Sequence, residues 1–375
     1  MRESHRLSTE KGWGNMKKIC WMLMLILVIS LAAAGCGKEE DKTESSVARQ
    51  EGDDGESISI GMSFDSFVIE RWVRDRDVFV ATAKNLGASV NVQNANGSVK
   101  EQISQIEYLI SKGIDVLVVI PVDCSSLKEV IGEAKKAGIS VISYDRLLLD
   151  SAADLYISFD NEVVGRLMGQ ALKDSIPEGG EIFMLQGPEE DNNVQFVRKG
   201  FLDELEGSGL EIVYKANCEG WLAEKAAEYL DEALEQYPDV KGIMCGNDDI
   251  ASQVVRVLTE NRMAGKVQVV GQDGDLAACQ RIVEGTQTMT AFKSVESLAE
   301  AAAEFAVRMA QGDPLNDVTE TITDGTNEIP FSMLMPVAVT GENMDEIIVD
   351  GGFHSREDVY LNVADDSSVF ADESQ

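Results

Sequence analysis

The sequence is short of histidine, of aromatic residues and of positive charge. His5 and His354 are the only histidines among 375 residues, which leaves almost no room for a metal or nucleophilic site built on imidazole. Aromatic residues make up 6% of the chain against 44% hydrophobic residues, so the core is aliphatic, as in parallel sheets covered by helices. With 32 Lys and Arg against 66 Asp and Glu, the net charge is -34, and a surface this acidic is repelled by phosphates. Nucleic-acid binding is therefore not expected, and the acidity by itself indicates solubility rather than a partner.

Motifs of catalysis and of cofactor binding are also missing. There is no P-loop, no G-x-G-x-x-G after the first apolar run and no G-x-S-x-G. Cys124, Cys218, Cys245 and Cys279 fit neither a C-x-x-C pair nor a zinc ligand set, and are expected to be small buried residues. An exported protein can oxidise such a pair, and the spacing does not say which. We expect no enzyme activity, no cofactor and no metal.

The N-terminal segment has the order of a secretory signal. Met16-Lys17-Lys18 precedes an apolar stretch from Ile19 to Ala34, and small residues follow it. The stretch is short for a membrane span. Residues 1–15 fit an upstream misassigned start, which leaves Met1 and Met16 as alternative start residues.

Ala33-Ala34-Gly35-Cys36 resembles a bacterial lipobox, in which the cysteine carries the lipid, although Leu is more usual at the place of Ala33. Residues 37–56 are polar and acidic and predict a flexible tether between the lipid and a folded domain. The alternative is a membrane-spanning anchor ending near Ala34, and both place the same domain outside the cell membrane.

Beyond the tether, short aliphatic runs alternate with amphipathic helical patterns. In 98–112, for example, Ile103, Ile106 and Ile110 recur at three- and four-residue steps, and Gly113 and Gly138 stand where helices would stop. Regular alternation of this kind predicts parallel sheets with right-handed crossovers, and ten strands are natural for two lobes that divide at Asp160-Asn161. The strand predictions are 57–64, 89–94, 115–121, 140–145, 155–159, 181–187, 211–217, 242–246, 267–272 and 287–292.

Polar and aromatic residues stand at or just past the ends of these runs. In an open α/β sheet the ligand sits at the carboxyl ends of the strands. Trp covers the apolar face of a pyranose, Asp accepts from its hydroxyls, Arg donates in a rigid fork, and Asn does both. Mixed charges that cancel suit a neutral ligand. The segments are Glu70–Asp77, Ser143–Arg146, Ile157–Asn161, Gly246–Asp248, Gly271–Asp273 and Phe292-Lys293, and together they predict a sugar site.

A spaced set of motifs over about residues 57–362 resembles the bacterial D-xylose-binding proteins, of the ribose-binding-like group of periplasmic binding proteins. The set comprises Arg71-Trp72 with Arg74–Asp77, Tyr144–Arg146, Tyr156–Asn161, Asp191–Asn193, Gly220-Trp221, Asn247-Asp248, Gly271–Asp273 and Gly285–Thr290. Departures from the familiar pattern are Glu219, Ser294 and the acidic stretch Gly187–Glu190.

The resemblance implies two Rossmann-like, doubly wound lobes joined by a three-crossover hinge, with the sugar between them. It divides the chain into a signal peptide with lipobox (1–36), the tether (37–56), an N-terminal lobe (57–160 and 294–329), a C-terminal lobe (161–293 and 330–362) and an acidic tail (363–375). The implied sugar contacts are Arg71, Trp72, Arg146, Asp160, Asn161, Trp221, Asn247, Asp273 and Lys293, with Asp145 and Asn193 as weaker candidates.

Each of these residues also has a plainer interpretation. A tryptophan is usually semi-buried core, and an Arg or Asp more often forms a surface ion pair. Asp160, Asn247 and Asp273 could cap the helices that follow them. The run Arg74–Asp77 is expected to be a solvated, ion-paired start of the first helix.

The implied function is binding of a monosaccharide, D-xylose first, by a monomeric, lipid-anchored, exported protein that delivers it to an ABC permease. The alternatives are a sensor that presents its closed form to a receptor kinase or chemoreceptor, and the same transport role for ribose, arabinose or glucose. A sugar-responsive repressor shares the fold but needs a basic helix-turn-helix where this chain has a signal and an acidic tether. A glycosidase needs one carboxylate set apart as an acid, and nothing in the sequence does so.

Overall fold

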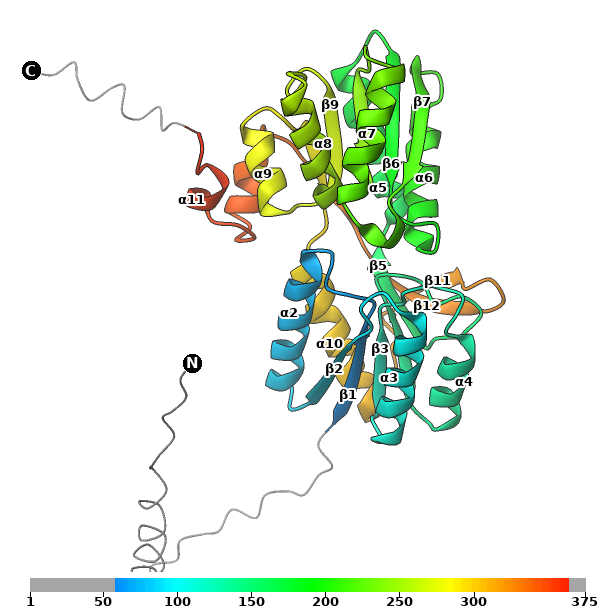
Figure 1. The fold of residues 1–375 in the computed structure, drawn as a ribbon. Coiled ribbons are helices and arrows are strands. Elements are labelled where there is room, and N and C mark those ends of the chain that lie inside the picture. The colour runs from blue at the N-terminus through cyan, green and yellow to red at the C-terminus, as the bar shows by residue number, and fades with distance from the viewer. Residues whose placement is uncertain (1–57, 364–375) are drawn as a thin grey trace, which may run out of the picture. The chain divides into compact units, whose positions relative to one another are not determined.

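The computed structural model describes residues 58–363, which form two α/β lobes (Figure 1). The first lobe holds a seven-stranded sheet of order β11-β12-β5-β4-β3-β1-β2, and the second a six-stranded sheet of order β13-β10-β9-β8-β6-β7. All pairings are parallel except β11 with β12 and β10 with β13. The predicted fold of two doubly wound lobes is confirmed.

The first lobe sandwiches its sheet between two pairs of helices. Alternate residues of β3 face opposite ways, because Val116 and Val118 pack with α2 and α10 while Leu117 and Val119 pack with α3 and α4. This explains why its central strands read as continuous apolar runs. The elements are β1 (Ser59–Phe64), α2 (Arg71–Asn85), β2 (Ser89–Asn94), α3 (Val99–Ser111), β3 (Val116–Val119), α4 (Lys128–Lys136), β4 (Ser140–Tyr144), β5 (Leu155–Phe159), α10 (Val295–Gln311), β11 (Glu320–Thr323) and β12 (Glu328–Leu334).

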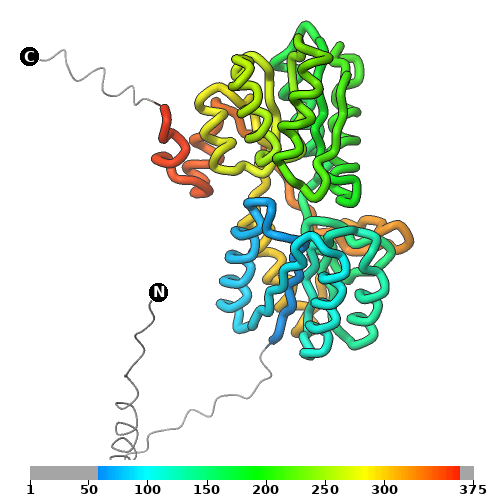
Figure 2. Tube along the Cα trace, viewed as in Figure 1, coloured from blue at the N-terminus to red at the C-terminus, as the bar shows by residue number. Residues whose placement is uncertain are grey.

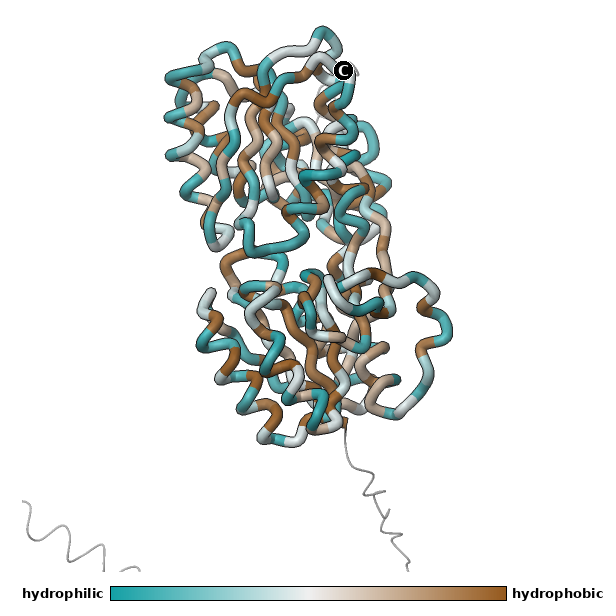
Figure 3. The backbone as a smooth tube through the Cα atoms, turned by 90° about the vertical axis from the view of Figure 1, so that its right-hand side faces the viewer, coloured by the Kyte–Doolittle hydropathy of each residue, from teal (hydrophilic) through white to brown (hydrophobic). Residues whose placement is uncertain are grey.

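The second lobe repeats this strand order with its own helices. The brown, hydrophobic segments of Figure 3 run along the strands of both lobes, and teal segments lie on the outer helices. The elements are α5 (Asn161–Ser175), β6 (Gly180–Gln186), α6 (Asn192–Leu205), β7 (Leu210–Asn217), η1 (Glu219–Trp221), α7 (Glu224–Gln236), β8 (Gly242–Cys245), α8 (Asp248–Glu260), β9 (Gln268–Asp273), α9 (Leu276–Val283), β10 (Met289–Phe292), β13 (Val337–Val339), η2 (Asp345–Val349) and α11 (Arg356–Val359).

The helix boundaries follow their capping residues. The Ser98 side chain accepts from the backbone N–H of Glu101 at the start of α3. Gly113 and Gly138, just past α3 and α4, have φ of 68° and 83°, a conformation that glycine adopts without strain. The predicted stops at these two glycines are confirmed.

Helices α5 and α6 pack with their backbones unusually close. A Cβ built on Gly165 would lie 2.0 Å from the carbonyl oxygen of Val197, and one on Gly200 would lie 1.9 Å from that of Glu162. Both glycines are required for this approach, because no side chain fits at either place. The pair forms one wall of the core that carries β6 and β9.

The chain passes between the lobes three times: from β5 to α5, from β10 to α10 and from β12 to β13 (Figure 2). The third passage is later than predicted. Residues 330–334 belong to the first sheet, because β12 pairs in parallel with β5, so the predicted boundary at 329/330 is too early. The strands β11, β12 and β13 were not among the ten predicted.

The four cysteines of the described chain are unpaired and buried. Burial raises the pKa of the Cys124 and Cys218 thiols to about 12. The predicted signal, lipobox cysteine Cys36, tether and acidic tail lie outside the described residues, apart from residue 363. Within residues 58–363, no helix combines the length and the apolar character that crossing a membrane requires.

Candidate functional site

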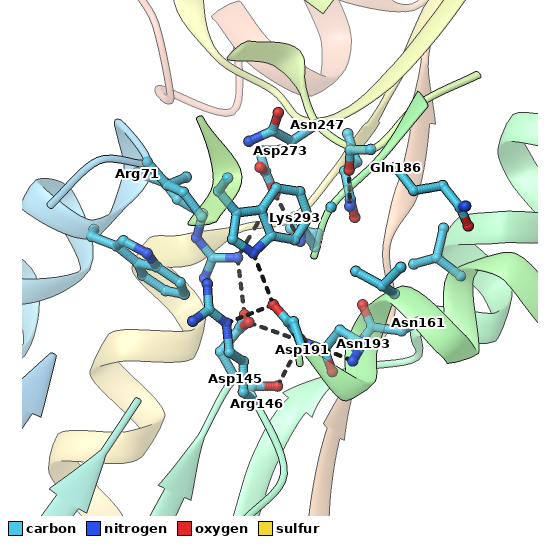
Figure 4. A pocket seen from close by; sticks show the side chains of 18 of the residues that line it. Arg71, Asp145, Arg146, Asn161, Gln186, Asp191, Asn193, Asn247, Asp273 and Lys293 are labelled. Atoms are coloured by element: carbon cyan, nitrogen blue, oxygen red, sulfur yellow. Dashed lines mark hydrogen bonds and ion pairs between the residues drawn. The ribbon is translucent and has the colours of Figure 1, made fainter. Parts of the chain in front are cut away.

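A pocket lies between the two lobes, where the carboxyl ends of their strands meet (Figure 4). A site in this position is what a doubly wound sheet predicts. The wall consists of Ile69, Arg71, Trp72, Asp145, Arg146, Asn161, Gln186, Gly187, Asp191, Asn193, Val194, Val197, Trp221, Met244, Gly246, Asn247, Gln272, Asp273 and Lys293.

Arg71, the first residue of α2, is the centre of a buried ion network. Its guanidinium donates to both carboxylate oxygens of Asp75 at 3.0 and 3.1 Å, and its Nη1 lies 2.9 Å from Asp145 Oδ2. Burial lowers the pKa of Arg71, but the carboxylates of Asp145, Asp75 and Asp273 raise that pKa well above its ordinary value. The prediction of a solvated run 74–77 is wrong for Asp75, which is fully buried because Arg71 and Tyr144 hydrogen-bond to it.

Arg146 joins the two lobes. It follows β4, and its Nη1 donates to Asp65 Oδ2 at 2.8 Å and to the carbonyl of Pro121 at 3.0 Å, both in the first lobe. Its Nε lies 2.6 Å from Asp191 Oδ2 in the second lobe. Its neighbour Asp145 has φ of 62°, a strained backbone that aims the two side chains along different walls.

Asp145 reaches across the same gap. Its Oδ1 and its backbone carbonyl both accept from Asn193 Nδ2, at 3.0 Å each. Burial raises the pKa of Asp145, but Arg71, Lys293 and Arg146 outweigh burial, so the pKa lies below its ordinary value. This carboxylate is therefore ionised at neutral pH.

Asn247 and Asp273 supply the wall of the second lobe. Asn247 Oδ1 accepts from the backbone N–H of Ile250 at 2.9 Å and so caps α8, while its Nδ2 has no partner within the described chain. Capping and ligand contact are thus not alternatives for this residue. Asp273 Oδ1 lies 2.7 Å from Lys293 Nζ and 3.8 Å from Arg71 Nη1.

Two tryptophans line the pocket from opposite lobes. Trp72 is 1% exposed, and the guanidinium carbons of Arg71 and Arg146 lie 4.5 and 5.6 Å from the centre of its ring. Trp221 donates from Nε1 to Asp191 Oδ2 at 3.1 Å. Its ring lies over Gly187, where a Cβ would come within 2.3 Å of it. Both rings are core residues and wall residues at once.

Several buried polar atoms of the wall lack a hydrogen-bond partner within residues 58–363. They are Trp72 Nε1, Arg146 Nη2, Asn247 Nδ2 and Gln272 Oε1. An unmet buried donor or acceptor costs about 1–3 kcal/mol. Donors and acceptors gathered in one pocket are therefore suited to a ligand that offers both, such as a polyol.

Ten of the eleven predicted contact residues line this pocket, and Asp160 does not. The Asp160 carboxylate accepts from the backbone N–H of Val163 at 2.9 Å and caps α5, which turns it away from the wall that its neighbour Asn161 joins. The capping interpretation is right for Asp160.

The sequence reasoning missed Asp191, Gln186 and Gln272 as wall residues. Asp191 and Gln272 stand inside motifs that the sequence singled out, Asp191-Asn192-Asn193 and Gly271-Gln272-Asp273, so the signal was present at the right strand ends. Gln186 is the last residue of β6, and only its position at the strand end points to it.

Comparisons with known proteins agree along most of the chain. Residues 60–314 match the family model described as a periplasmic binding protein domain. The chain is 42% identical over 308 residues to the D-xylose-binding periplasmic protein of Haemophilus influenzae, covering 81% of this chain and 92% of the relative. It is 39% identical over 308 residues to the D-xylose-binding periplasmic protein of Escherichia coli, covering 80% and 92%.

A solved structure shares the fold. It is an ABC transporter solute-binding protein from Clostridium phytofermentans with bound β-D-glucose, with a TM-score of 0.73 and 29% identity. The match covers 80% of this chain and 99% of that one. The similarity thus extends over both lobes.

Proposed function

This chain belongs to the periplasmic binding proteins, and from that premise we propose that it binds a monosaccharide, D-xylose, between its lobes for delivery to an ABC permease. The observation that carries the proposal is the pocket wall, where charged groups are mutually paired and unpaired neutral donors and acceptors face a shared space. A neutral polyol meets such a wall without burying a new charge. The family consists of binding proteins, and we propose no catalytic role.

The proposed contacts are the ten predicted residues of the wall together with Asp191, Gln186 and Gln272. Their arrangement supports a two-part site. Arg71, Trp72, Asp145 and Arg146 belong to the first lobe, and the remaining residues to the second lobe and the connections between the lobes. Sugar that bridges the two halves favours the closed form, which is the shape a membrane partner recognises.

We propose that the partner is a permease and that the protein is an exported monomer held to the membrane by a lipid on Cys36. The relatives at 42% and 39% identity are named as periplasmic binding proteins, which supports export. A sensory role through a receptor kinase or chemoreceptor needs the same closed form. Deleting a neighbouring permease gene and, separately, a neighbouring sensor gene distinguishes the two roles, because only the first deletion should stop uptake of the sugar if the protein serves transport.

The test is calorimetric titration of the chain lacking residues 1–36 with D-xylose and then with a panel of pentoses and hexoses. We expect micromolar or tighter binding of D-xylose and weaker binding of the other aldoses. If folded protein gives no heat with any aldose, the proposal is wrong. Tighter binding of ribose, arabinose or glucose would change the ligand while keeping the transport role.

Affinity for D-xylose is expected to rise as the pH falls from 8 to 5, by up to about tenfold. Carboxylate oxygens of Glu70 from the first lobe and of Asp249 and Asp275 from the second lie within 4.8 Å of one another. Burial, with the charges of Asp273 and Glu70, raises the pKa of Asp249 to about 6. Burial, with the charges of Asp248 and Asp273, raises the pKa of Asp275. Burial is the largest cause that raises both pKa values, and opening the lobes exposes these carboxylates to solvent, so their pKa values fall in the open form although the Glu70 backbone N–H no longer donates to Asp249. Closing therefore takes up protons, and binding tightens where the closed form is protonated.

The measurement is the dissociation constant at each pH in the parent and in Asp249→Asn. The variant should bind more tightly than the parent at pH 8 and show a flatter profile. The prediction is refuted if the affinity of the parent for D-xylose does not change with pH, or if it rises as the pH rises. Asp145 does not disturb this range, because its lowered pKa keeps it ionised above pH 5.

A further inference from the structure

Asp248 is a buried carboxylate that faces no pocket wall and yet touches the segment that carries a proposed sugar contact. It is 1% exposed. Its Oδ2 accepts from the backbone N–H groups of Gly274 at 3.0 Å and Asp275 at 3.2 Å and from the Thr290 hydroxyl at 2.7 Å. Its Oδ1 accepts from Gln287 Nε2 at 2.9 Å. Four hydrogen-bond donors of the protein thus converge on the Asp248 carboxylate.

The segment that Asp248 holds is strained. Asp273 has φ of 105° and Gly274 has φ of 81°. For a residue other than glycine such a φ is strained and persists only where surrounding contacts impose it. The two amides that follow Asp273 both donate to the Asp248 carboxylate, whereas Thr290 Oγ1 accepts from Gly274 N alone and His354 Nε2 contacts the Gly274 carbonyl. Asp248 is therefore the one side chain that holds both amides of this turn.

Asp248 also fixes the distance between two proposed sugar contacts, Asn247 and Asp273. It follows Asn247 directly, so the residue that anchors the Asp273 turn is covalently bonded to another polar wall residue of this lobe. Space around it is tight, since a Cβ on Gly271 would lie 2.3 Å from Asp248 Oδ1. A rigid link between α8 and the end of β9 fixes where Asn247 and Asp273 stand relative to each other.

We propose that Asp248 is a positioning residue of the sugar site, which acts through Asp273 by holding the turn Asp273–Asp275 in its strained form. The inference rests on the proposed sugar function. It assigns Asp248 no contact with the sugar.

A double-mutant cycle in sugar binding tests this directly. D-xylose affinity is measured for the parent, Asp248→Asn, Asp273→Asn and the double variant. We expect Asp248→Asn to weaken binding about tenfold in the parent and less than twofold in the Asp273→Asn background. The change in melting temperature caused by Asp248→Asn should be the same in the parent and in the Asp273→Asn variant.

Asp324→Asn is the matched control. Asp324 is fully buried and also accepts from several backbone amides, those of Ser151, Ala152, Thr326 and Asn327, but it lies in the β11–β12 turn. The Asp324→Asn substitution should lower the melting temperature and leave the D-xylose affinity unchanged.

Equal weakening by Asp248→Asn in both backgrounds, or an unchanged affinity in a folded Asp248→Asn protein, overturns the proposal. If Asp248→Asn does not fold, Thr290→Val takes its place, because the Thr290 hydroxyl donates to Asp248 and accepts from Gly274 N at 3.1 Å. We then expect Thr290→Val to weaken D-xylose binding about threefold in the parent, and by less in the Asp273→Asn background. If the parent binds neither D-xylose nor any other aldose of the panel, the sugar function is overturned and this role with it.

Discussion

Replacing Asp273 with alanine is expected to weaken D-xylose binding by about 2–4 kcal/mol, or roughly 30- to 900-fold. The carboxylate lies between Lys293 Nζ at 2.7 Å and Arg71 Nη1 at 3.8 Å in a dry part of the pocket. Its removal takes away an acceptor for sugar hydroxyls and leaves Lys293 buried without its ion partner. Calorimetric titration of the folded variant measures the loss.

Asp160→Ala is the control for this experiment. Asp160 is also an aspartate at a strand end before a helix, but its carboxylate caps α5 and does not line the pocket. It should cost about 1 kcal/mol of unfolding free energy and leave the affinity unchanged. A folded Asp273→Ala protein that binds D-xylose like the parent would remove Asp273 from the site.

Replacing Gly200 with alanine is expected to lower the free energy of unfolding by about 3 kcal/mol. The added methyl group would sit 1.9 Å from the carbonyl oxygen of Glu162, so α5 and α6 must move apart. That movement opens the core under β6, since Val164, Phe201 and Ile182 pack in the same cluster. Urea unfolding followed by circular dichroism measures the change.

Gly132→Ala supplies the comparison, because Gly132 lies inside α4 with no atom within 4 Å of an added Cβ. There the same substitution should stabilise the protein by up to about 1 kcal/mol, since alanine favours the helix. Equal effects at the two glycines would mean that the close approach of α5 and α6 does not matter.

The ten strands predicted from the sequence are all present. Most of them are apolar runs that the sheet buries on both faces, whereas β2 and β7 are partly exposed edge strands. Of the three missed strands, β11 and β13 lie at sheet edges and β12 lies between β11 and β5. Most of their residues are exposed or only partly buried, so burial does not mark them as strands. A usable signal existed in Asp324-Gly325, a hairpin turn between β11 and β12. Recognising that hairpin would have placed the third passage after 334.

The site was harder to predict in detail than in position. Asp160 and Asn247 occupy equivalent places, each the residue before a helix, and each caps its helix. Asn247 lines the pocket while its Oδ1 caps the helix, and its Nδ2 is left without a partner in the described chain, whereas Asp160 caps its helix and does not line the pocket. Side-chain rotamers and strained backbone angles, such as those of Asp145 and Asp273, arise only in the folded chain, so the hydrophobic periodicity of the sequence does not predict them.

The three passages between the lobes also constrain the order in which the protein can fold. The first lobe needs α10, which packs on α2, and β12, which pairs with β5, and both follow the whole second-lobe sequence up to β10. Its core therefore stays incomplete until residues up to 334 have joined it. The second lobe, whose strands β6 to β10 are contiguous in the chain, can collapse first and give the late segments a surface on which to assemble.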